Sequence, residues 1–532
     1  MPIVHTPLTR RQFGFSLCAL PLAIRSEAAE WAASMPWNGP ATVARVYLSA
    51  PKIHWPKPTL DVPQEVKEVE AHLVEVARQH TRNVRFVGGE VLTAADQVKP
   101  WLAKMGAIDG VLIIPVAQPT PPLGALVDSL EVPALFFSRP YATHAWASIG
   151  QMSRSGKKID VIATSSYGDL DPYMEAFRAI HHMRNSKVLV GCENQPARQP
   201  SADAYSKHFG MGFRFVSGDE LKAAFHSTDV QKAQKEADAF TKGALRVMET
   251  TPKEILDGLR MYLAALKLMQ AERANAYTID CFGTLAANTL PGYPCISWSK
   301  LNDVGLYGVC EADLNSTVTQ IMVTGHTSMP GFVSDPVMDI SRNEVIHAHC
   351  VAATRMKGIN GPASPYILRN HLETNEGTVV QVLMPAGETI TVGRFNGPGK
   401  FLISTAEVTG AVDSDRGCRS QIRTRVSDAE KWLRNYTGGL HRVIFYGDHV
   451  KTIERMGRLT GFEVVTRSSY RRGWRCGQAS RSRRRPYARP NGGSGRRVPA
   501  PFRACVRTRR SSPRDPRPSR TARLFMRPPI AP

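Results

Sequence analysis

Short apolar runs alternate with amphipathic segments over residues 43–165, and this alternation constrains the fold more than any other feature of the chain. The apolar runs have the length of strands, whereas the segment EVKEVEAHLVEVARQ carries its apolar residues at helical spacing. The runs are VARVYLSA, NVRFVGG, DGVLIIPV, VPALFFS and IDVIATSS. Such alternation predicts a doubly wound parallel sheet. No GxGxxG follows the first strand, which disfavours a dinucleotide-dependent dehydrogenase, and we interpret Gly88-Gly89 as a turn.

A second α/β unit begins at Asp169. We predict a helix at PYMEAFRAIHHMR, strands at SKVLVGC and FRFVSG, a helix at DELKAAF and a long helical region from about Val230 to Ala274. His181 and His182 are adjacent and therefore face different sides of their helix. We interpret them as surface or capping residues rather than metal ligands.

Residues 330–466 differ in character, because Gly and Thr are interspersed in short β runs such as TVVQVLMPAGETITVGRF and KFLISTAEVTGAV. This pattern predicts a small β-barrel or sandwich, followed by an amphipathic helix at VKTIERMGRLTGF. At 532 residues the chain exceeds the size at which one hydrophobic core keeps growing, so several domains are expected. The predicted segments are a signal peptide (1–37), an N-terminal Rossmann-like α/β domain (38–168), a second α/β domain (169–329), a C-terminal β domain (330–466) and a disordered tail (467–532).

The N-terminus has the layout of a twin-arginine export signal. Arg10 and Arg11 precede the apolar stretch FGFSLCALPLAI, which is too short to cross a bilayer, and small residues suitable for cleavage follow at Ala28-Ala29 and Ala32-Ala33. An accidental Arg pair before a short core helix is the alternative. We expect a periplasmic or otherwise exported protein, which would be cytoplasmic if the signal is not functional.

Almost all of the excess positive charge lies at the C-terminus. Residues 467–532 contain twenty Arg and a single acid, Asp515, whereas the whole chain has a formal net charge of +22. A segment this rich in Arg, Pro, Ser and Gly cannot bury enough surface to offset its chain entropy, so we predict disorder. A basic arm that binds nucleic acid is one interpretation, but the abrupt onset of Arg without Lys favours a shifted reading frame. The nearly neutral body predicts no nucleic-acid partner, and no 18-residue apolar run predicts a membrane span.

Four acidic or imidazole side chains are candidate metal ligands. They are Glu311 in GVCEADLNST, Asp335 in GFVSDP, His349 in EVIHAHC and His441 in GGLHRVIFYGDH. Two carboxylates with imidazoles suit Mn2+, Co2+ or Mg2+, whereas the lack of CxxC pairs predicts buried free thiols and disfavours a structural zinc site. Taken singly, an Asp before Pro is common in turns and a His in a strand is commonly a core residue, so the residues by themselves indicate a metal site only weakly.

Together, these segments resemble the sugar isomerase family that includes L-fucose isomerase and L-arabinose isomerase. In the fucose branch a Glu follows a short strand and precedes a polar turn, which is similar to CEADLNST with Glu311, and a Met-x-Gly-His turn follows, which is similar to MVTGHTSMPG with His326. An acid after a Phe-Val strand is similar to Asp335. A His that opens a strand running into a Gly-x-His and a helix is similar to HRVIFYGDHVKTIERMGRLTGF, with His441 and His449.

The arabinose branch adds a His after an Asn-Glu and apolar pair, which NEVIHAHC resembles and which indicates His349, with His347 as the alternative. The resemblance extends over about Thr278 to Val465 and covers the N-terminal half only in outline. It implies two Rossmann-like α/β domains followed by a C-terminal β-barrel domain. It also implies a homotrimer or homohexamer whose active sites are partly built from a neighbouring subunit.

The resemblance further implies a Mn2+-dependent aldose-ketose isomerase that acts on a monosaccharide through an enediol. Such a reaction needs a base that moves a proton between C2 and C1 and a divalent cation that holds O1 and O2. In this assignment Glu311 and Asp335 are catalytic residues and ligands, and His349 and His441 are neutral ligands. Asp448 or His449 is a candidate hydrogen-bond partner of these ligands. A catalytically diverged sugar-binding protein of the same fold is the alternative, although a pure binder has no need for paired carboxylates around a cation.

Overall fold

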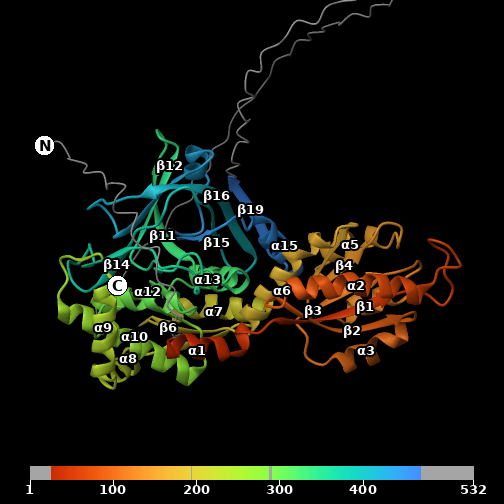
Figure 1. The fold of residues 1–532 in the computed structure, drawn as a ribbon, viewed down its shortest axis with the longest axis horizontal. Coiled ribbons are helices and arrows are strands. Elements are labelled where there is room, and N and C mark those ends of the chain that lie inside the picture. Colours follow the sequence, from red (N-terminus) through yellow and green to blue (C-terminus); the bar gives the residue numbers. More distant parts are fainter. Residues whose placement is uncertain (1–25, 193, 287–289, 469–532) are drawn as a thin grey trace, which may run out of the picture. The chain divides into compact units, whose positions relative to one another are not determined.

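The computed structural model describes residues 26–192, 194–286 and 290–468. The predicted twin-arginine motif and residues 469–532 of the predicted tail lie outside the described residues. The described part contains two parallel sheets, a closed barrel of six antiparallel strands and a small three-stranded sheet (Figure 1). The predicted mixed α/β class with a C-terminal barrel is therefore confirmed, whereas the domain boundaries stay predictions.

The first parallel sheet has the strand order β2-β1-β3-β4-β5, and every neighbouring pair is parallel. The order 2-1-3-4-5 is a common one in doubly wound sheets. The strands are β1 (Ala41–Leu48), β2 (Val84–Leu92), β3 (Gly110–Pro115), β4 (Ala134–Ser138) and β5 (Ile159–Ala163). The helices are α2 (Val62–Gln79), α3 (Val98–Met105), α4 (Pro122–Ser129), α5 (Trp146–Arg154) and α6 (Asp171–Arg184).

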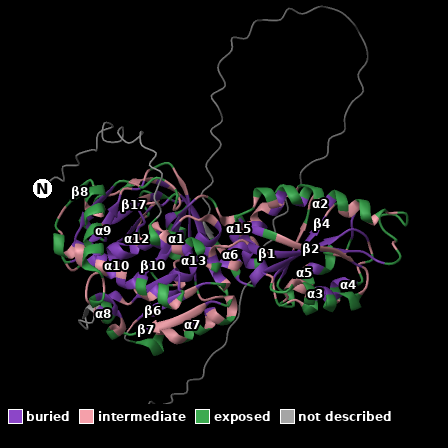
Figure 2. Cartoon of the chain, turned by 60° about the horizontal axis from the view of Figure 1, so that its bottom comes forward, coloured by how far each residue is buried: buried purple, intermediate pink, exposed green. Residues whose placement is uncertain are grey.

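Alternate residues of β1 face two different layers of helices. Val43 and Tyr47 pack in one core cluster with Leu73 of α2. Ala44 and Val46 pack in a second cluster that contains residues of α3, α4 and α5. Because side chains of a strand alternate between its faces, helices cover both sides of this sheet. The buried strands and the exposed outer sides of the helices are visible in Figure 2.

The interpretation of Gly88-Gly89 as a turn is wrong. Both glycines lie within β2, opposite a register shift between Arg45 and Val46 of β1. Their φ angles of +73° and +126° are in the region that favours glycine, and a Cβ atom on Gly88 would lie 2.8 Å from the Arg45 carbonyl oxygen. The pair therefore forms a β-bulge that lets the strand continue.

The second parallel sheet has the order β10-β9-β6-β7. The predicted long helical region consists of two helices that are separated by the short strand β8, and the second one starts at Pro252 with a side-chain cap from Thr251. The strands are β6 (Lys187–Gly191), β7 (Gly212–Val216), β8 (Arg246–Val247), β9 (Ala276–Ile279) and β10 (Tyr307–Cys310). The helices are α7 (Gln195–Phe209), α8 (Gly218–His226), α9 (Val230–Gly243), α10 (Pro252–Glu272), α11 (Cys281–Ala286), α12 (Cys295–Asp303) and α13 (Leu314–Thr327).

The prediction that both adjacent histidines of α6 are surface or capping residues is wrong for His182. Its Nδ1 donates to the Trp37 carbonyl at 2.8 Å and its Nε2 accepts from the Tyr307 hydroxyl at 2.7 Å. Burial lowers the pKa of His182 to about 3, so the ring is neutral. His181 pairs with Asp109 at 2.9 Å, and neither histidine belongs to a candidate ligand group of the described residues.

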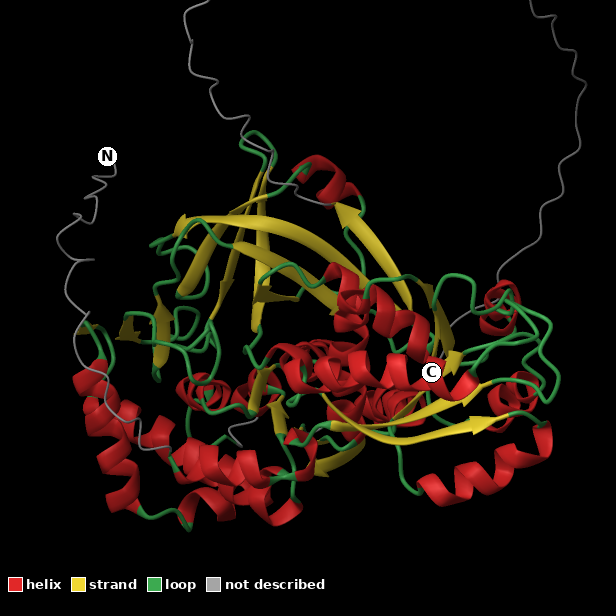
Figure 3. Cartoon of the chain, turned by 45° about the vertical axis from the view of Figure 1, so that its right-hand side comes forward, coloured by secondary structure: helices red, strands yellow, loops and turns green. Residues whose placement is uncertain are grey.

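The barrel closes because β15 pairs with both β18 and β16. Its order is β15-β18-β11-β12-β17-β16, with antiparallel neighbours throughout (Figure 3). A strand β19 after helix α15 adds in parallel to β16, so the predicted helix does not end the fold. These elements are β11 (Phe332–Asp339), β12 (Glu344–His349), β15 (Thr389–Phe395), β16 (Lys400–Ala411), β17 (Ser420–Arg425), α14 (Ala429–Arg434), β18 (Arg442–Tyr446), α15 (Val450–Thr460) and β19 (Glu463–Ser468).

The segment TVVQVLMPAGETITVGRF is divided between two sheets. Its first part is β14 (Val379–Val382), which pairs with β13 (Tyr366–Arg369), and β13 pairs with β8. Only its second part, β15, belongs to the barrel. The predicted continuous meander is therefore interrupted. The loop after β13 contributes His371 to the pocket that Glu311 and Asp335 line.

Helix α13 contacts β9 and β10 of the second sheet and also β11, β15 and β18 of the barrel. Nearly all of its residues are buried, including Ser316, Thr317, Thr319 and Thr324. Buried polar groups need partners, and the Thr319 hydroxyl accepts from the Phe395 N–H at 2.9 Å and donates to the Asn315 carbonyl at 2.7 Å. This packing holds the N-terminal end of α13 against the barrel.

The described chain begins with α1 (Glu27–Ser34), which overlaps the predicted signal peptide. The Ser26 hydroxyl caps this helix by accepting from the Ala29 N–H at 3.3 Å, and Ala28 and Ala32 are buried in the core. Cleavage at either predicted region would remove part of this packed helix. Among the helices that the structure describes, none combines the length and the apolar character that a membrane span requires.

Candidate metal centre

Strand pairing brings three of the four predicted ligands to one end of the barrel. The antiparallel register places Asp335 of β11 opposite Ala348 of β12, next to His349. On its other side β11 pairs with β18, with Ser334 opposite Arg442. One step further along this ladder, Asp335 lies across from His441.

Glu311 reaches the same place from the second parallel sheet. It directly follows β10, at the carboxyl end of the strand, where open α/β sheets present functional side chains. Glu311 and Ala312 both have left-handed backbone, with φ angles of +64° and +47°. Such a conformation costs a non-glycine residue about 1 to 3 kcal/mol and clusters at functional sites. The Ala312 N–H holds the turn by donating to the Ile279 carbonyl at 2.9 Å.

The four side chains converge on one point. His441 Nε2 lies 3.3 Å from Glu311 Oε2 and 3.4 Å from Asp335 Oδ1. His349 Nε2 lies 3.8 Å from Glu311 Oε1 and 4.0 Å from Asp335 Oδ2. Ligands about 2.1 Å from a shared cation are roughly 3 to 3.5 Å from one another. The observed separations are therefore close to those of a coordination sphere.

Asp313 holds His441 in place, and the sequence reasoning missed this residue. Asp313 accepts from His441 Nδ1 at 2.8 Å, from the Ser316 hydroxyl at 2.7 Å and from both terminal nitrogens of Arg394. Because the His441 Nδ1–H donates its proton to the hydrogen bond with Asp313, the lone pair of a neutral His441 is on Nε2, which faces the carboxylates of Glu311 and Asp335. The Asp before Leu-Asn-Ser in CEADLNST is a recognisable helix cap, and only this local role could have been predicted.

Burial and the charge of His441 determine the pKa values of Asp335 and Glu311. Burial, opposed by the charge of His441, raises the pKa of Asp335 to about 6. Burial also raises the pKa of Glu311, but the hydrogen bond and charge of His441 outweigh it and hold this pKa below its ordinary value. Burial lowers the pKa of His441, yet its hydrogen bonds to Asp313 and Glu311 raise it to about 10. A cation bound through His441 Nε2 must therefore displace a proton.

His349 differs from His441 in its hydrogen bonding. Its Nδ1 accepts from the Cys350 N–H at 2.8 Å, and burial lowers its pKa to about 3. The neutral ring therefore carries its proton on Nε2, and its approach to the two carboxylates is not an ion pair. To bind a cation through Nε2, the ring must turn over or lose this proton, which makes His349 the least prepared of the four residues.

Two buried polar atoms of the centre have no hydrogen-bond partner among the described residues, namely Asp335 Oδ1 and His349 Nε2. An unpaired buried polar atom costs about 1 to 3 kcal/mol. Asp335, His349 and His441 offer ligand atoms that all lie within 4.8 Å of one another. A divalent cation would satisfy Asp335 Oδ1, and it would satisfy His349 Nε2 once that nitrogen has lost its proton. A donor set of carboxylate oxygen and imidazole nitrogen suits Mn2+, Co2+ or Mg2+. The residues therefore fit such an ion.

The alternative ligand His347 lies elsewhere. Its Nδ1 is 3.1 Å from the Ser334 hydroxyl, and its ring packs 6.0 Å from Trp432. His326 lies at the other end of α13 from Asp313, about 20 Å along the helix axis at 1.5 Å per residue. The structure thus brings His349, and not these two histidines, to the centre.

The expected partners Asp448 and His449 do not contact the predicted ligands. His449 Nε2 lies 2.7 Å from the Tyr446 carbonyl, and its ring packs against that of His326. Asp448 accepts from the Val450 N–H at 3.2 Å at the start of α15. That expectation is wrong, because both residues serve the turn between β18 and α15, and Asp313 takes the role instead.

Glu311, Asp335 and His349 line a pocket whose wall is rich in thiols. The cysteines of this wall are free and buried, which confirms the prediction of buried thiols. Cys281 Sγ lies 2.9 Å from Cys310 Sγ and accepts from the Glu311 N–H at 3.5 Å. The other lining residues are Phe282, Tyr293, Pro294, Cys295, Cys350, His371, Glu373 and Cys418.

No protein-family model matches this chain, and a search of the curated proteins found no match.

Proposed function

We propose that this protein is a divalent-metal-dependent aldose-ketose isomerase, with Mn2+ as the preferred ion and a free pentose, 6-deoxyhexose or related monosaccharide as substrate. The observation that supports it most is the convergence of Glu311, Asp335 and His441 beside a pocket, with a buried Asp335 oxygen that has no partner among the described residues. Proton exchange between two adjacent carbons needs a base, and a neighbouring cation would stabilise the negative charge that develops on the oxygens.

Asp335 is the proposed base at carbon. Its side chain lines the pocket, and a carboxylate within reach of a bound substrate can act as a general base. It takes the proton from C2 of the aldose and returns the proton to C1 of the enediol. Glu311, whose carboxylate stays ionised, moves the second proton from the hydroxyl at O2 to O1. A cation held by Glu311, Asp335 and His441 would supply positive charge that stabilises the negative charge developing on the sugar oxygens.

His441 and Asp313 position the metal ion and do not contact the substrate. His441 is not among the residues that line the pocket, and its hydrogen bond to the buried Asp313 fixes its ring. A metal-binding imidazole that is oriented in this way keeps its Nε2 directed at the ion. The residues that reach a substrate are then Asp335, Glu311 and the polar side chains of His371 and Glu373 in the pocket wall.

A catalytically diverged sugar-binding protein of the same fold is the second candidate. The observation that favours it is the hydrogen bond from the Cys350 N–H to His349 Nδ1, which leaves that ring unprepared to bind a cation through Nε2. The two candidates differ in turnover, because only the isomerase converts the sugar that it binds.

The test uses the full-length protein, its bound metals and a panel of aldoses. Ketose formation that chelator abolishes and Mn2+ restores would support the isomerase. Glu311→Gln and Asp335→Asn should abolish turnover, whereas Asp339→Asn, a change at a partly exposed acid on the same strand β11, should leave turnover unchanged. Bound metal and bound sugar without turnover would favour the diverged binder, and equal activity in all variants would refute the assignment of both carboxylates.

We also propose that the protein is exported through the twin-arginine pathway, which carries folded proteins, and that it assembles as a homotrimer or homohexamer. Fractionation of cells that produce the protein naturally tests the export, and sedimentation equilibrium of the purified protein tests the oligomeric state. A cytoplasmic monomer would contradict both.

A further inference from the structure

We propose that Cys350, Cys418 and His371 form a second metal site, specific for a thiophilic d10 cation such as Zn2+, in the wall of the same pocket. This site is separate from the oxygen- and nitrogen-rich centre, and the proposal does not depend on the isomerase activity. It also revises the expectation that the cysteines hold no metal, since that expectation rested on the absence of CxxC pairs in the sequence.

The barrel register brings the two cysteines together. In the ladder between β12 and β17, His349 lies opposite Ser420. Cys350 follows the end of β12 and Cys418 precedes the start of β17, so both thiols lie at the same end of the two neighbouring strands. Sixty-eight positions of sequence separate them, and no local spacing motif could show this proximity.

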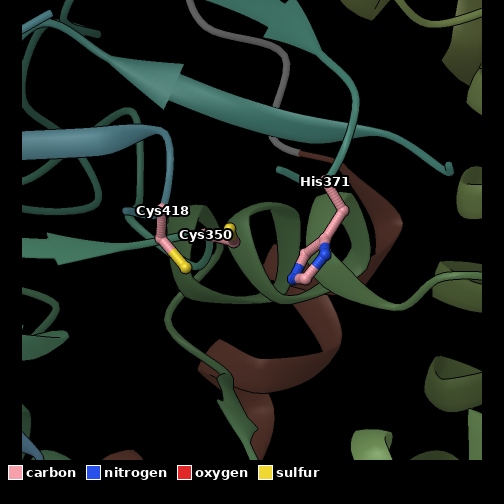
Figure 4. Close-up of side chains that lie close together, drawn as sticks. All are labelled: Cys350, His371 and Cys418. Atoms are coloured by element: carbon pink, nitrogen blue, oxygen red, sulfur yellow. The ribbon is translucent and has the colours of Figure 1, made fainter. Parts of the chain in front are cut away.

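His371 approaches from a different part of the chain, the loop after β13. In Figure 4 the side chain of Cys418 points toward the His371 ring, and Cys350 lies between them. The sulfur atoms of the two cysteines and one ring nitrogen of His371 all lie within 4.8 Å of one another. In a tetrahedral Zn2+ site with Zn–S bonds of about 2.3 Å, sulfur ligands are roughly 3.8 Å apart, so a small inward movement completes the site.

The His371 ring is held in an orientation that suits a ligand. Its Nδ1 lies 3.3 Å from the Thr374 hydroxyl, and in the tautomer in which Nδ1 donates to this hydroxyl the Nε2 lone pair is left for a cation. The loop itself is tightened by the His371 N–H, which donates to the Glu376 carbonyl at 3.0 Å, and by the Asn375 N–H, which donates to the His371 carbonyl at 2.8 Å. Burial lowers the pKa of His371, so the ring is neutral and able to bind metal.

The burial of the three residues distinguishes this group from surface thiols. Cys350, Cys418 and His371 are all buried, and Cys295 packs in the same cluster as the two cysteines. The contact with Cys350 and burial raise the pKa of Cys418, so the thiol stays protonated unless a cation compensates the thiolate charge. Buried thiols are commonly small apolar residues of a core. Here, however, they line a pocket beside a neutral imidazole, and two sulfurs with one nitrogen form a zinc ligand set.

The three ligands leave a fourth coordination position that faces the pocket. Zinc sites with three protein ligands and one exchangeable position are the catalytic type, whereas structural sites have four protein ligands. Glu373 and Cys295 line the same pocket and are candidates to fill this position in the absence of a substrate. The proposed ion therefore lies where a pocket ligand can reach both it and the Glu311–Asp335 centre.

The test uses Co2+ as a spectroscopic substitute for Zn2+. Full-length protein is reduced, stripped with chelator and titrated with Co2+, and near-ultraviolet absorption from thiolate-to-Co2+ charge transfer is recorded. We expect a band in the wild type that one equivalent of Zn2+ removes. Cys418→Ser and, separately, Cys350→Ser should abolish the band and weaken Zn2+ binding by more than the roughly 10- to 100-fold that loss of an outer partner costs.

Two control variants make the result specific. Cys192→Ser changes a cysteine outside this pocket and should keep the band. Glu311→Gln removes a ligand of the other centre and should also keep it, so a failure of the isomerase proposal is distinguishable from a failure of this one. Circular dichroism of each reduced, metal-free variant checks that the fold is retained.

Three results would overturn the proposal. The first is a wild type without a thiolate charge-transfer band. The second is a band that survives in both cysteine variants. The third is a Cys350–Cys418 disulfide in protein purified without reductant, together with no Zn2+ binding after reduction.

Discussion

Replacing Asp313 by Asn tests the organisation of the candidate centre without changing any predicted ligand. The Asp313 carboxylate binds His441 Nδ1 at 2.8 Å and also pairs with Arg394, whose side chain is only 6% exposed. An amide at this position either directs an NH2 group at the His441 Nδ1–H or offers a neutral oxygen in place of a carboxylate. In both cases the imidazole loses the partner that fixes its tautomer and orientation.

The expected effects have two separate magnitudes. Loss of a carboxylate that orients a metal-binding His typically weakens metal affinity by about 10- to 100-fold, or roughly 1.4 to 2.7 kcal/mol. Removal of the partner of a buried charge costs about 3 to 5 kcal/mol of folding stability, and Arg394 is left as that charge. We therefore expect Asp313→Asn to bind Mn2+ more weakly and to unfold at lower denaturant concentration.

Mn2+ titration by isothermal calorimetry or electron paramagnetic resonance measures the first effect, and urea unfolding of metal-free protein measures the second. Asp109→Asn is the matched control, because Asp109 forms a buried pair with His181 at 2.9 Å in another part of the fold. It should lose stability and keep its Mn2+ affinity. Equal affinities for wild type and Asp313→Asn, or an equal loss in both variants, would refute this role of Asp313.

Three further predictions follow from the ionisation of named groups. Burial raises the pKa of Asp335 from 3.8 to about 6, so the ionised side chain destabilises the fold above pH 6. Asp335→Asn should therefore abolish turnover and stabilise the metal-free protein at pH 7.5 by up to about 3 kcal/mol, measured by urea unfolding. A destabilised variant would contradict this. His441 has a pKa of about 10, so metal binding should release about one proton, and the metal affinity should rise about tenfold per pH unit between pH 7 and 9. Calorimetry in buffers of different ionisation enthalpy measures the number of protons released. Metal binding that does not depend on pH would refute this prediction. His182 has a pKa of about 3 in the folded protein and about 6.5 in the unfolded one, so its contribution to the free energy of unfolding is fully present above pH 6.5 and is lost as the pH falls. At pH 5.5 the loss is about 1.4 kcal/mol. His182→Gln should remove this part of the acid dependence of stability.

The first parallel sheet is the part of the fold that local pattern predicts well. The apolar runs that become β1 to β5 are each short, β1, β3 and β4 are fully or largely buried, and α2 between the first two has a clear apolar face. Pattern alone misjudged Gly88-Gly89, because a β-bulge and a turn both use glycine with positive φ. It also misjudged His182, since a buried, fully hydrogen-bonded His looks in sequence like a polar helix residue.

The candidate centre was predictable only in part. Glu311, Asp335, His349 and His441 were identified by resemblance, and the structure brings each of the two histidines within 4.0 Å of both carboxylates. Asp313 was visible only as a helix cap, because its contacts with His441 and Arg394 span 128 and 81 positions of the chain. The group of Cys350, His371 and Cys418 had no sequence signal at all.

The sequence by itself determined which segments form strands and helices, which of their faces are apolar, where helices begin and where the positive charge is concentrated. These properties depend on residues within one or two turns of each other, so they can be read along the chain. Only the tertiary structure decided that β15 closes the barrel onto β16, that Asp335 lies across from His441, and that two cysteines meet a histidine in the pocket wall. Strand pairing and pocket assembly depend on which buried faces pack together across the whole fold, and an apolar pattern marks a face as buried without specifying its partner.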